Sequence, residues 1–311
     1  MRRWLMALSL VVASRAAVAH EMVALTFDDL PALTLLKSQS YVTYTNEKLL
    51  RGLKHHHLSA TGFVNEGKFD ELDRPKQIMI LRKWLEAGMD LGNHSFSHES
   101  PNKLSADGYI LDIAKGEQVT RPLAAEYGRT LQWFRHPYLE TGTPLEVKQK
   151  IDAWLGSHGY RIAPVTMENS DWLFAEPYDD AIARHDDARA NRIKAAYLAY
   201  TAKVIPWYQN AAHLLLGRDI SYVMLLHVAR LNADCIDQLN LILSHDKLHV
   251  VTLGKAMQDP AYQRVDDYAG PDGIEWLERW SLSLHKDLPW SSFPEPPPEI
   301  ESDYRRVDND L

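Results

Sequence analysis

Short apolar segments alternate along the chain with longer stretches of helical pattern. Several of these segments lack the strict apolar–polar alternation of a half-exposed strand, as expected for strands that are buried on both faces. The repeated strand-then-helix order predicts a parallel sheet with right-handed crossovers. The segments predicted as strands are Met22–Phe27, Ala60–Val64, Met89–Gly92, Leu131–Phe134, Tyr160–Val165, Ser221–Leu226 and Leu248–Leu253.

Helical patterns fill the intervals between these strands. In Arg74–Ala87, apolar residues recur on one helical face, and Gly88 stands where a C-terminal cap is expected. The predicted helices are Thr45–His56, Arg74–Ala87, Ser105–Tyr127, Pro144–His158 and Asp234–Ser244.

The ends of the predicted strands distinguish an open sheet from a barrel. An open sheet gathers its site at one switch point, whereas a barrel builds its site from many strands around one rim. Polar residues follow most of the strands here, which favours the barrel. They are Asp28, Asp29, Asn65, His94, His98, Arg135, Asp171 and His227. We therefore predict an α/β fold, a distorted or incomplete (β/α) barrel with about seven parallel strands.

Residues 1–19 have the pattern of a secretory signal peptide. Met1-Arg2-Arg3 provides a charged start, an apolar stretch follows, and Ala17-Val18-Ala19 provides a cleavage site before His20. The apolar stretch is shorter than the roughly 20 residues that a membrane-spanning helix needs. We expect an exported protein, periplasmic or secreted, without stable membrane insertion.

The charge of the chain argues against one class of partner. Removal of residues 1–19 changes the formal net charge from −8 to −11, because that segment holds three arginines and no acidic residue. An acidic protein without a basic stripe is poorly suited to bind nucleic acid. Cys235 is the single cysteine, so no intrachain disulfide forms and the core must hold the fold.

Two segments depart from simple strand–helix alternation. Residues 178–216 are mostly helical in pattern, and we expect an inserted helical pair in which Pro206 ends or kinks a helix. Residues 293–311 start with a proline-rich run and continue with mixed charges, which predicts an extended or disordered tail. The single domain that carries the site is expected to span residues 20–292.

Asp28 and Asp29 form an acidic pair at the end of the first predicted strand. Adjacent residues of a strand point to opposite sides, so the two carboxylates are expected to serve different roles, one at a metal and one at the substrate. A solvated turn or a helix N-cap is the alternative for an isolated Asp-Asp pair.

His94 and His98 provide two imidazoles after the third predicted strand. Their spacing places both rings on one face if the segment makes a helical turn, and paired histidines at this spacing are common zinc ligands. An incidental pair is the alternative. Together with one carboxylate they leave coordination positions open for water and substrate, as in a catalytic metal site.

Five motifs, in order, resemble those of the polysaccharide deacetylases, the NodB-like carbohydrate esterases of family four. Thr26-Phe27-Asp28-Asp29-Leu30-Pro31 resembles the family's Thr-Phe-Asp-Asp-Gly-Pro, and His94-Ser95-Phe96-Ser97-His98 resembles its His-Ser/Thr-x-x-His. The three later matches are Arg135-His136-Pro137-Tyr138, Glu168-Asn169-Ser170-Asp171-Trp172 and Leu225-Leu226-His227.

The resemblance implies a metal-dependent hydrolase that removes N-acetyl groups from an acetylated glycan or oligosaccharide by attack of metal-bound water. Asp29, His94 and His98 would be the metal ligands, with Zn²⁺ the expected ion and Co²⁺ or Ni²⁺ as alternatives. Asp28 would be the general base. Arg135 would hold Asp28 and favour its ionised form.

The resemblance also assigns the remaining site residues. His227 would be the general acid, oriented by Asp171, and the backbone amide of Tyr138 would bind the oxyanion. Trp172, Pro137 and Leu30 would lie at the substrate. An amide has a poor leaving group, so its hydrolysis needs both carbonyl polarisation and a proton for nitrogen.

The chain departs from the family's motifs at a few positions. Leu30 replaces the usual glycine and is expected to reshape the acetyl pocket or to exclude some sugars. Glu168 replaces aspartate, and Val228 stands where aspartate or asparagine is frequent. The segment 178–216 falls between the last two motifs. These departures concern the substrate more than the reaction.

Three other functions remain open from the sequence. Two histidines and one carboxylate also describe non-haem iron oxygenases, although that class leaves Asp28, Arg135 and His227 without a role. A non-catalytic glycan-binding barrel would retain the fold without the chemistry. A deacylase acting on a small, non-polymeric amide would retain both.

Overall fold

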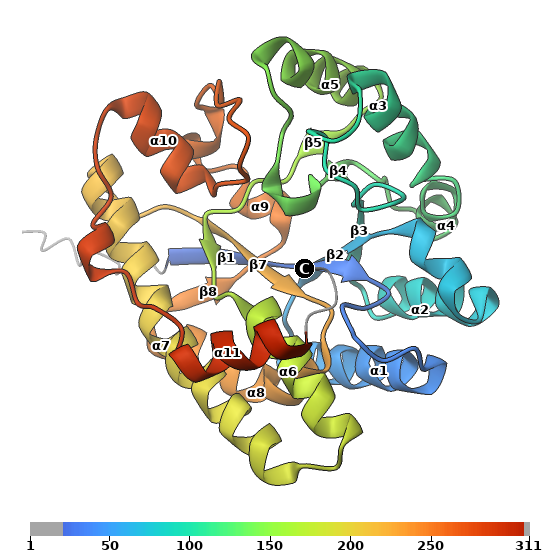
Figure 1. Ribbon diagram of the computed structural model, residues 1–311. Coiled ribbons are helices and arrows are strands. Elements are labelled where there is room, and N and C mark those ends of the chain that lie inside the picture. Colours follow the sequence, from blue (N-terminus) through green and yellow to red (C-terminus); the bar gives the residue numbers. More distant parts are fainter. Residues whose placement is uncertain (1–20, 308–311) are drawn as a thin grey trace, which may run out of the picture.

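The computed structural model describes residues 21–307. The predicted signal peptide and residues 308–311 lie outside this range. The described chain forms an eight-stranded parallel sheet in the order β5-β4-β3-β2-β1-β7-β6, with β8 paired to the start of β1 (Figure 1). The curled sheet and its surrounding helices confirm the predicted distorted barrel. The strands are β1 (Glu21–Leu30), β2 (Ala60–Val64), β3 (Asp90–Asn93), β4 (Trp133–Phe134), β5 (Arg161–Ile162), β6 (Met167–Glu168), β7 (Tyr222–His227) and β8 (Leu248–Val250).

One short segment connects the two ends of the sheet. The Ala163 amide donates to Phe134 of β4 (2.8 Å), and three residues later the Thr166 amide donates to Val223 of β7 (3.0 Å). Pro164 lies between them and has no amide hydrogen to donate to a ladder. The strand predicted over Tyr160–Val165 is therefore present but shorter, as β5, and the chain then leaves β4 and continues as β6 beside β7.

Helices pack around the sheet (Figure 1). Their starts follow local rules: Ser38, Asp73 and Ser105 are N-caps whose side chains accept hydrogen bonds from backbone amides. The predicted helix Ser105–Tyr127 is two helices, because α3 ends at the cap Gly116. The helices are α1 (Gln39–His55), α2 (Arg74–Glu86), α3 (Ala106–Lys115), α4 (Thr120–Glu126), α5 (Leu145–Ser157), α6 (Asp171–Ala183), α7 (Asp187–Leu216), α8 (Arg230–His245), α9 (Leu253–Ala256), α10 (Trp276–Leu284) and α11 (Pro298–Val307), with 3₁₀ turns η1 (Glu66–Glu71), η2 (Pro137–Leu139), η3 (Pro260–Gln263) and η4 (Trp290–Ser292).

The expected helical pair is present, with different boundaries. It consists of α6 and α7, so it starts at Asp171, within the fourth motif, rather than at residue 178. Of the two alternatives for Pro206, ending a helix is wrong, because α7 continues through it to Leu216. Extensive burial of α7 offsets the backbone hydrogen bond that proline removes.

The C-terminal tail is helical where the sequence suggested an extended or disordered chain. Pro298 occupies the first turn of α11, a position that proline favours, and the acidic Glu299 and Glu301 precede the basic Arg305 and Arg306. Ile300 is buried against the core. The helix packs against α6, and Figure 1 shows it lying across this face of the molecule.

None of the helices within residues 21–307 has both the length and the apolar character needed to cross a membrane.

Candidate active site

Alternate residues of β1 point into the barrel. Val23, Leu25 and Phe27 belong to the large core between sheet and helices, whereas Ala24 belongs to a separate, smaller cluster with Phe63, Trp133 and Val223 from neighbouring strands. Strand periodicity places Thr26 and Asp28 on the same side as Ala24. The carboxylate of Asp28 therefore lies inside the barrel, above this small cluster.

Arg135, which follows β4, occupies the barrel interior beside Asp28. Its guanidinium is 3.1 Å from the Asp28 carboxylate, donates to the Thr26 hydroxyl (3.0 Å) and to the Ala163 carbonyl (2.8 Å), and lies 4.8 Å from the centre of the Phe63 ring. The residue is fully buried. The arginine expected to hold Asp28 is thus in contact with it.

Burial and charge act on Asp28 in opposite directions. Desolvation raises the pKa of its carboxyl, the Arg135 guanidinium opposes that rise, and the net effect is a raised pKa. Arg135 alone would favour the ionised form, as the sequence suggested. A carboxylate with a raised pKa is a stronger base, which suits a general base working near neutral pH.

The backbone brings Asp29 to the same site as Asp28. Asp29 has a φ of 65°, and the pairing register between β1 and β2 shifts between Phe27 and Leu30. This irregularity interrupts the alternation of the strand. The expectation that the two carboxylates point to opposite sides is therefore wrong, although they contact different partners.

His94 and His98 meet through an irregular loop and not through a helical turn. Ser95 and His98 have φ values of 65° and 59°. The loop is fixed from both ends, because Asn93 accepts from the Ser95 amide (2.8 Å) and Ser95 accepts from the His98 amide (3.1 Å). The two imidazoles lie edge to face with ring centres 4.9 Å apart.

Asp29, His94 and His98 form a cluster that fits a divalent metal ion. One ligand atom from each lies within 4.8 Å of the others. His94 donates from Nδ1 to the Arg135 carbonyl (2.8 Å), which leaves its Nε2 free to bind a metal. Burial lowers the pKa of both imidazoles to about 4, so they are neutral near pH 7, as ligands must be. Two nitrogens and one oxygen suit zinc and related ions.

Lys68 is a charged neighbour of this cluster that the sequence analysis missed. It lies on η1, with its Nζ 3.1 Å from Asp29 Oδ1 and 3.3 Å from the Ala32 carbonyl. Burial raises the pKa of Asp29, but Lys68 and the imidazoles outweigh this and hold it well below its usual range. Lys68 follows Asn65, a predicted rim residue, by three positions, and this spacing could have indicated that Lys68 lies near the site.

His227 and Asp171 form a second pair at the end of β7, where His227 lies beside Asp28 in the β1–β7 register. His227 donates from Nδ1 to one Asp171 oxygen (2.7 Å), and its backbone amide donates to the other (2.7 Å). Burial alone lowers the pKa of His227, but the Asp171 carboxylate raises it to about 9. The imidazole is therefore protonated near pH 7, with Nε2 left as a proton donor.

Two further residues position this pair and were not predicted. Asn232, on α8, donates to the Asp171 carboxylate and to the His227 carbonyl (2.8 Å), and it accepts from the Tyr197 hydroxyl (2.6 Å). Tyr197 lies on α7. The predicted insertion thus contributes to the orientation of His227. No short motif contains these residues, because their contacts come from distant segments.

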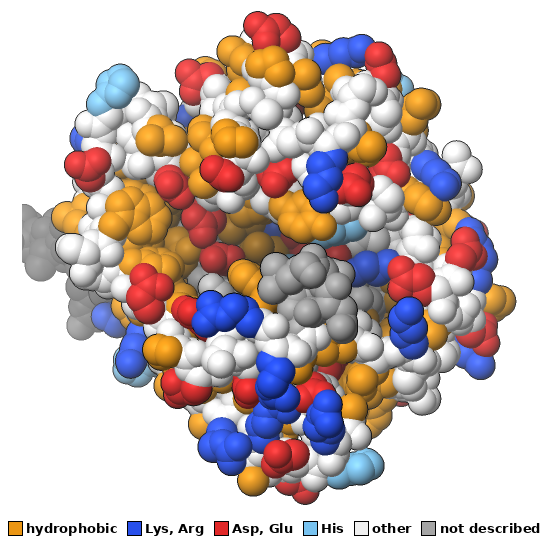
Figure 2. All heavy atoms as spheres, in the orientation of Figure 1, with side chains coloured by type: hydrophobic (Ala, Val, Ile, Leu, Met, Phe, Trp, Pro, Cys, Tyr) orange, Lys and Arg blue, Asp and Glu red, His pale blue; other side chains and the backbone are white. Residues whose placement is uncertain are grey.

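The residues predicted at the substrate have different environments. Tyr138 is 55% exposed and its ring lies 4.7 Å from that of His98, whereas Pro137 is buried. Trp172 is 38% exposed, and its ring packs edge to face on Tyr304 of α11. Figure 2 shows a hollow near the centre of the face in view, with acidic and hydrophobic side chains on its walls.

Comparison with known proteins places this site in a family. The sequence model of the polysaccharide deacetylase family matches residues 15–163, which include Asp28, Asp29, His94, His98 and Arg135. The match covers just under half of the chain and supports the NodB-like polysaccharide deacetylase family that the motifs resemble. The predicted family is thereby confirmed.

Two curated members of the family resemble the chain over part of their length. A peptidoglycan-N-acetylglucosamine deacetylase from Bacillus cereus is 31% identical over 153 residues, which cover 48% of this chain and 46% of that protein. A chitin deacetylase from Colletotrichum lindemuthianum is 27% identical over 156 residues, 50% of this chain and 55% of that protein. The chain therefore spans about half the length of these deacetylases.

Solved structures share the fold at low sequence identity. A family 4 carbohydrate esterase from Streptomyces lividans, in complex with acetate, has a TM-score of 0.50 and 20% identity over 76% of this chain and 95% of its own. A family 4 pseudoenzyme from Bacillus anthracis has a TM-score of 0.52 and 15% identity over 77% of this chain and 66% of its own.

Leu30, which replaces a glycine usual in the deacetylase family, is not at the substrate. Its side chain is fully buried in the hydrophobic core. It fills space beside Gly62 of β2, where an added Cβ would lie 3.0 Å from both Leu30 and Trp84. The expectation that Leu30 reshapes the acetyl pocket is therefore wrong: the absence of a side chain at Gly62 accommodates it in the core.

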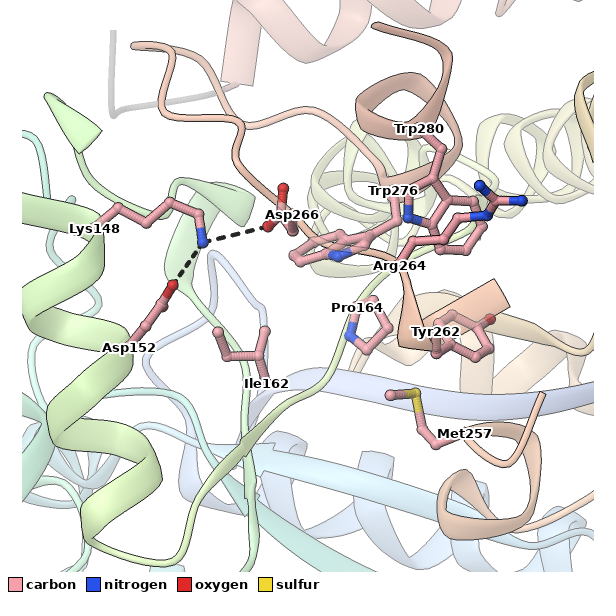
Figure 3. A pocket seen from close by; sticks show the side chains of 10 residues that line it. All are labelled: Lys148, Asp152, Ile162, Pro164, Met257, Tyr262, Arg264, Asp266, Trp276 and Trp280. Carbon is pink, nitrogen blue, oxygen red and sulfur yellow. Dashed lines mark hydrogen bonds and ion pairs between the residues drawn. The ribbon is translucent and has the colours of Figure 1, made fainter. Parts of the chain in front are cut away.

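A cavity of about 250 Å³ lies beside the segment that connects β5 and β6. Figure 3 shows Lys148 of α5 on one side, paired with Asp152 and Asp266 at 2.7 and 3.5 Å, and Trp276 of α10 on the other. Among the described residues, none of those predicted for catalysis lines this cavity.

Proposed function

We propose that the protein is a metal-dependent hydrolase that removes N-acetyl groups from an acetylated amino-sugar glycan. The observation that carries this proposal is the arrangement of two ion pairs around one three-residue metal cluster: the buried Asp28–Arg135 pair, which supplies the base, and the largely buried His227–Asp171 pair, which supplies the acid. The peptidoglycan and chitin deacetylases that the chain resembles act on substrates of this class. An extracellular or envelope glycan agrees with the export predicted from residues 1–19.

Asp29, His94 and His98 would hold the metal ion, most simply Zn²⁺. A divalent ion bound there supplies a Lewis acid that polarises a carbonyl and makes water more acidic. The chain's own residues supply the rest of the chemistry, and each has a defined atom for it.

The two acid–base residues act on different groups, Asp28 on the attacking water and His227 on the leaving nitrogen. Asp28 accepts the proton of the attacking water, and the neighbouring Arg135 keeps the carboxylate in place. His227 then donates its Nε2 proton to the leaving nitrogen, while Asp171 fixes Nδ1 and the ring plane. The Tyr138 amide donates to the oxygen that gains negative charge during attack, which stabilises the transition state more than the substrate.

Acetate release tests the proposal directly. Metal-loaded protein is expected to release acetate from chitin oligosaccharides or from N-acetylated peptidoglycan, and removal of the metal with a chelator is expected to abolish release until metal is restored. A small N-acetylated amide included in the panel tests the non-polymeric alternative. Glycan binding by metal-loaded protein without acetate release would favour the non-catalytic barrel, and oxygen uptake with bound iron would favour an oxygenase.

The pH dependence is expected to report the acid pair. Because His227 must hold its proton to act as the acid and its pKa is raised to about 9, kcat/KM should be retained up to about pH 9 and fall above it. Asp171→Asn removes the charge that raises this pKa, so the alkaline limb should move to lower pH by about one unit or more. Asp219→Asn removes the partner of the exposed His213 and is the control. An unchanged alkaline limb in Asp171→Asn would exclude His227 as the acid.

A further inference from the structure

The segment that carries the proposed oxyanion donor, the Tyr138 N–H, has an unusual backbone. Tyr138 and Leu139 are consecutive non-glycine residues with φ values of 56° and 58°. Side chains disfavour this left-handed region, so such a conformation persists only where surrounding contacts fix it. The direction of the Tyr138 N–H depends on this conformation, because the φ of Tyr138 relates its N–H to the carbonyl that follows.

A loop from the C-terminal part of the chain lies directly against the next peptide, which joins Tyr138 to Leu139. A Cβ added at Gly273 would lie 1.6 Å from the Tyr138 carbonyl oxygen and 2.7 Å from its carbon. No side chain fits there, so the Gly273 backbone is packed against the Tyr138 carbonyl. The adjoining Trp276 amide, at the start of α10, donates to Val165 (2.7 Å) and attaches this loop to the β5–β6 segment.

Arg279, on α10, fixes the next carbonyl. Its guanidinium donates to the Leu139 carbonyl (2.6 Å) and to the Thr141 hydroxyl (3.2 Å). The side chain is 1% exposed and is itself held by Asp266 (3.0 Å) and by the Trp276 ring, 4.1 Å away. Figure 3 shows Asp266 and Trp276 on the wall of the cavity beside the β5–β6 segment.

We propose that Arg279 and Gly273 are positioning residues for amide hydrolysis: together they fix the carbonyls of Leu139 and Tyr138 so that the Tyr138 N–H is aimed at the developing oxyanion. This inference rests on the proposed function. Both residues lie outside the 15–163 region that matches the family, so the C-terminal part of the chain completes the catalytic site. Neither residue touches the reacting atoms, and both act through the Tyr138 peptide.

Arg279→Met tests the positioning role. Loss of an oxyanion donor lowers kcat by about 10²–10³-fold, and a displaced donor should lower it by about tenfold or more. The KM for the glycan and the affinity for Zn²⁺ should stay within about twofold, because the lost interaction forms mainly in the transition state. A tetrahedral phosphonate analogue should lose affinity by the same factor as kcat. Arg279→Lys, which can still donate to Leu139, should recover part of the activity.

Matched variants separate positioning from general stability. Arg121→Met is the control for Arg279, because Arg121 also donates to a backbone carbonyl, Leu131, and to a carboxylate, Glu117. Gly273→Ala, in an exposed loop, tests the same idea if Arg279→Met does not fold. Its control is Gly156→Ala, at an exposed position of α5 where the added Cβ has no heavy atom within 4 Å.

The outcomes distinguish this inference from the proposed function. Acetate release by the wild type, with a lower kcat in Arg279→Met and Gly273→Ala but not in Arg121→Met or Gly156→Ala, supports positioning. Acetate release by the wild type with an unchanged kcat in folded Gly273→Ala overturns it. Equal losses in the Arg279 and Arg121 variants also overturn it and indicate a structural role. Metal-loaded wild type that releases no acetate contradicts the proposed function itself.

Discussion

Asp28→Asn is expected to lower the kcat for acetate release by about 10²–10⁴-fold, the usual contribution of a general base. The amide of asparagine keeps the size of the side chain and an acceptor for Arg135, but it cannot take a proton from water. Zn²⁺ binding should persist, because Asp29, His94 and His98 are unchanged. Single-turnover acetate release and calorimetric metal titration measure the two effects separately.

Stability must be measured with this variant, since Asp28 is the counter-charge of a buried arginine. Removal of one partner from a buried ion pair costs about 3–5 kcal/mol, so the thermal midpoint should fall. Asp90→Asn is a suitable control, because Asp90 is also a strand residue paired with an arginine, Arg129, but lies at the opposite end of its strand. A kcat in Asp28→Asn within threefold of wild type would contradict the assignment of the base.

His98→Ala is expected to abolish both metal binding and acetate release. Changes to residues that merely support a metal ligand weaken binding by about 10–100-fold, and loss of the ligand itself should exceed that. His98 is preferable to His94 for this test. The His94 ring also donates to the backbone carbonyl of Arg135. His98 is partly exposed at the rim, so the loss of the His98 side chain disturbs the fold less.

The measurement is the number of bound Zn²⁺ ions and their affinity, with activity as a second readout. The chain carries another group of histidines, His55-His56-His57 at the end of α1, which can bind metal adventitiously. His57→Ala is therefore the control. If His57→Ala removes the tightly bound ion and His98→Ala does not, the metal centre is not the one proposed.

The fold was largely predictable because its signal is local. Buried strands appear as apolar runs, helices appear as periodic ones, and their alternation indicates a parallel barrel. β6 was missed because the strand is only two residues long and continues from β5 past Pro164. The tail helix carries local signals at its two ends, but they follow a proline-rich run, and its packing on α6 is a tertiary contact that the sequence does not display.

The candidate site divides in the same way. The residues within motifs could be identified from the sequence, but their backbone conformations could not be predicted. The left-handed conformations of Asp29 and Ser95 are imposed by neighbouring strands and by side-chain hydrogen bonds. Asn232 reaches the acid pair from α8, so its participation depends on tertiary contacts alone.

Leu30 and Gly62 illustrate how a departure from a family motif can be neutral for chemistry. The two positions lie on adjacent strands and share one space in the core. The Leu30 side chain occupies the space that a side chain at Gly62 would need. Relatives with glycine at the first position have room for a larger residue at the second, so the pair is expected to vary together. Side-chain volume can thus be exchanged between neighbouring strands beneath the site without changing the surface that contacts the substrate.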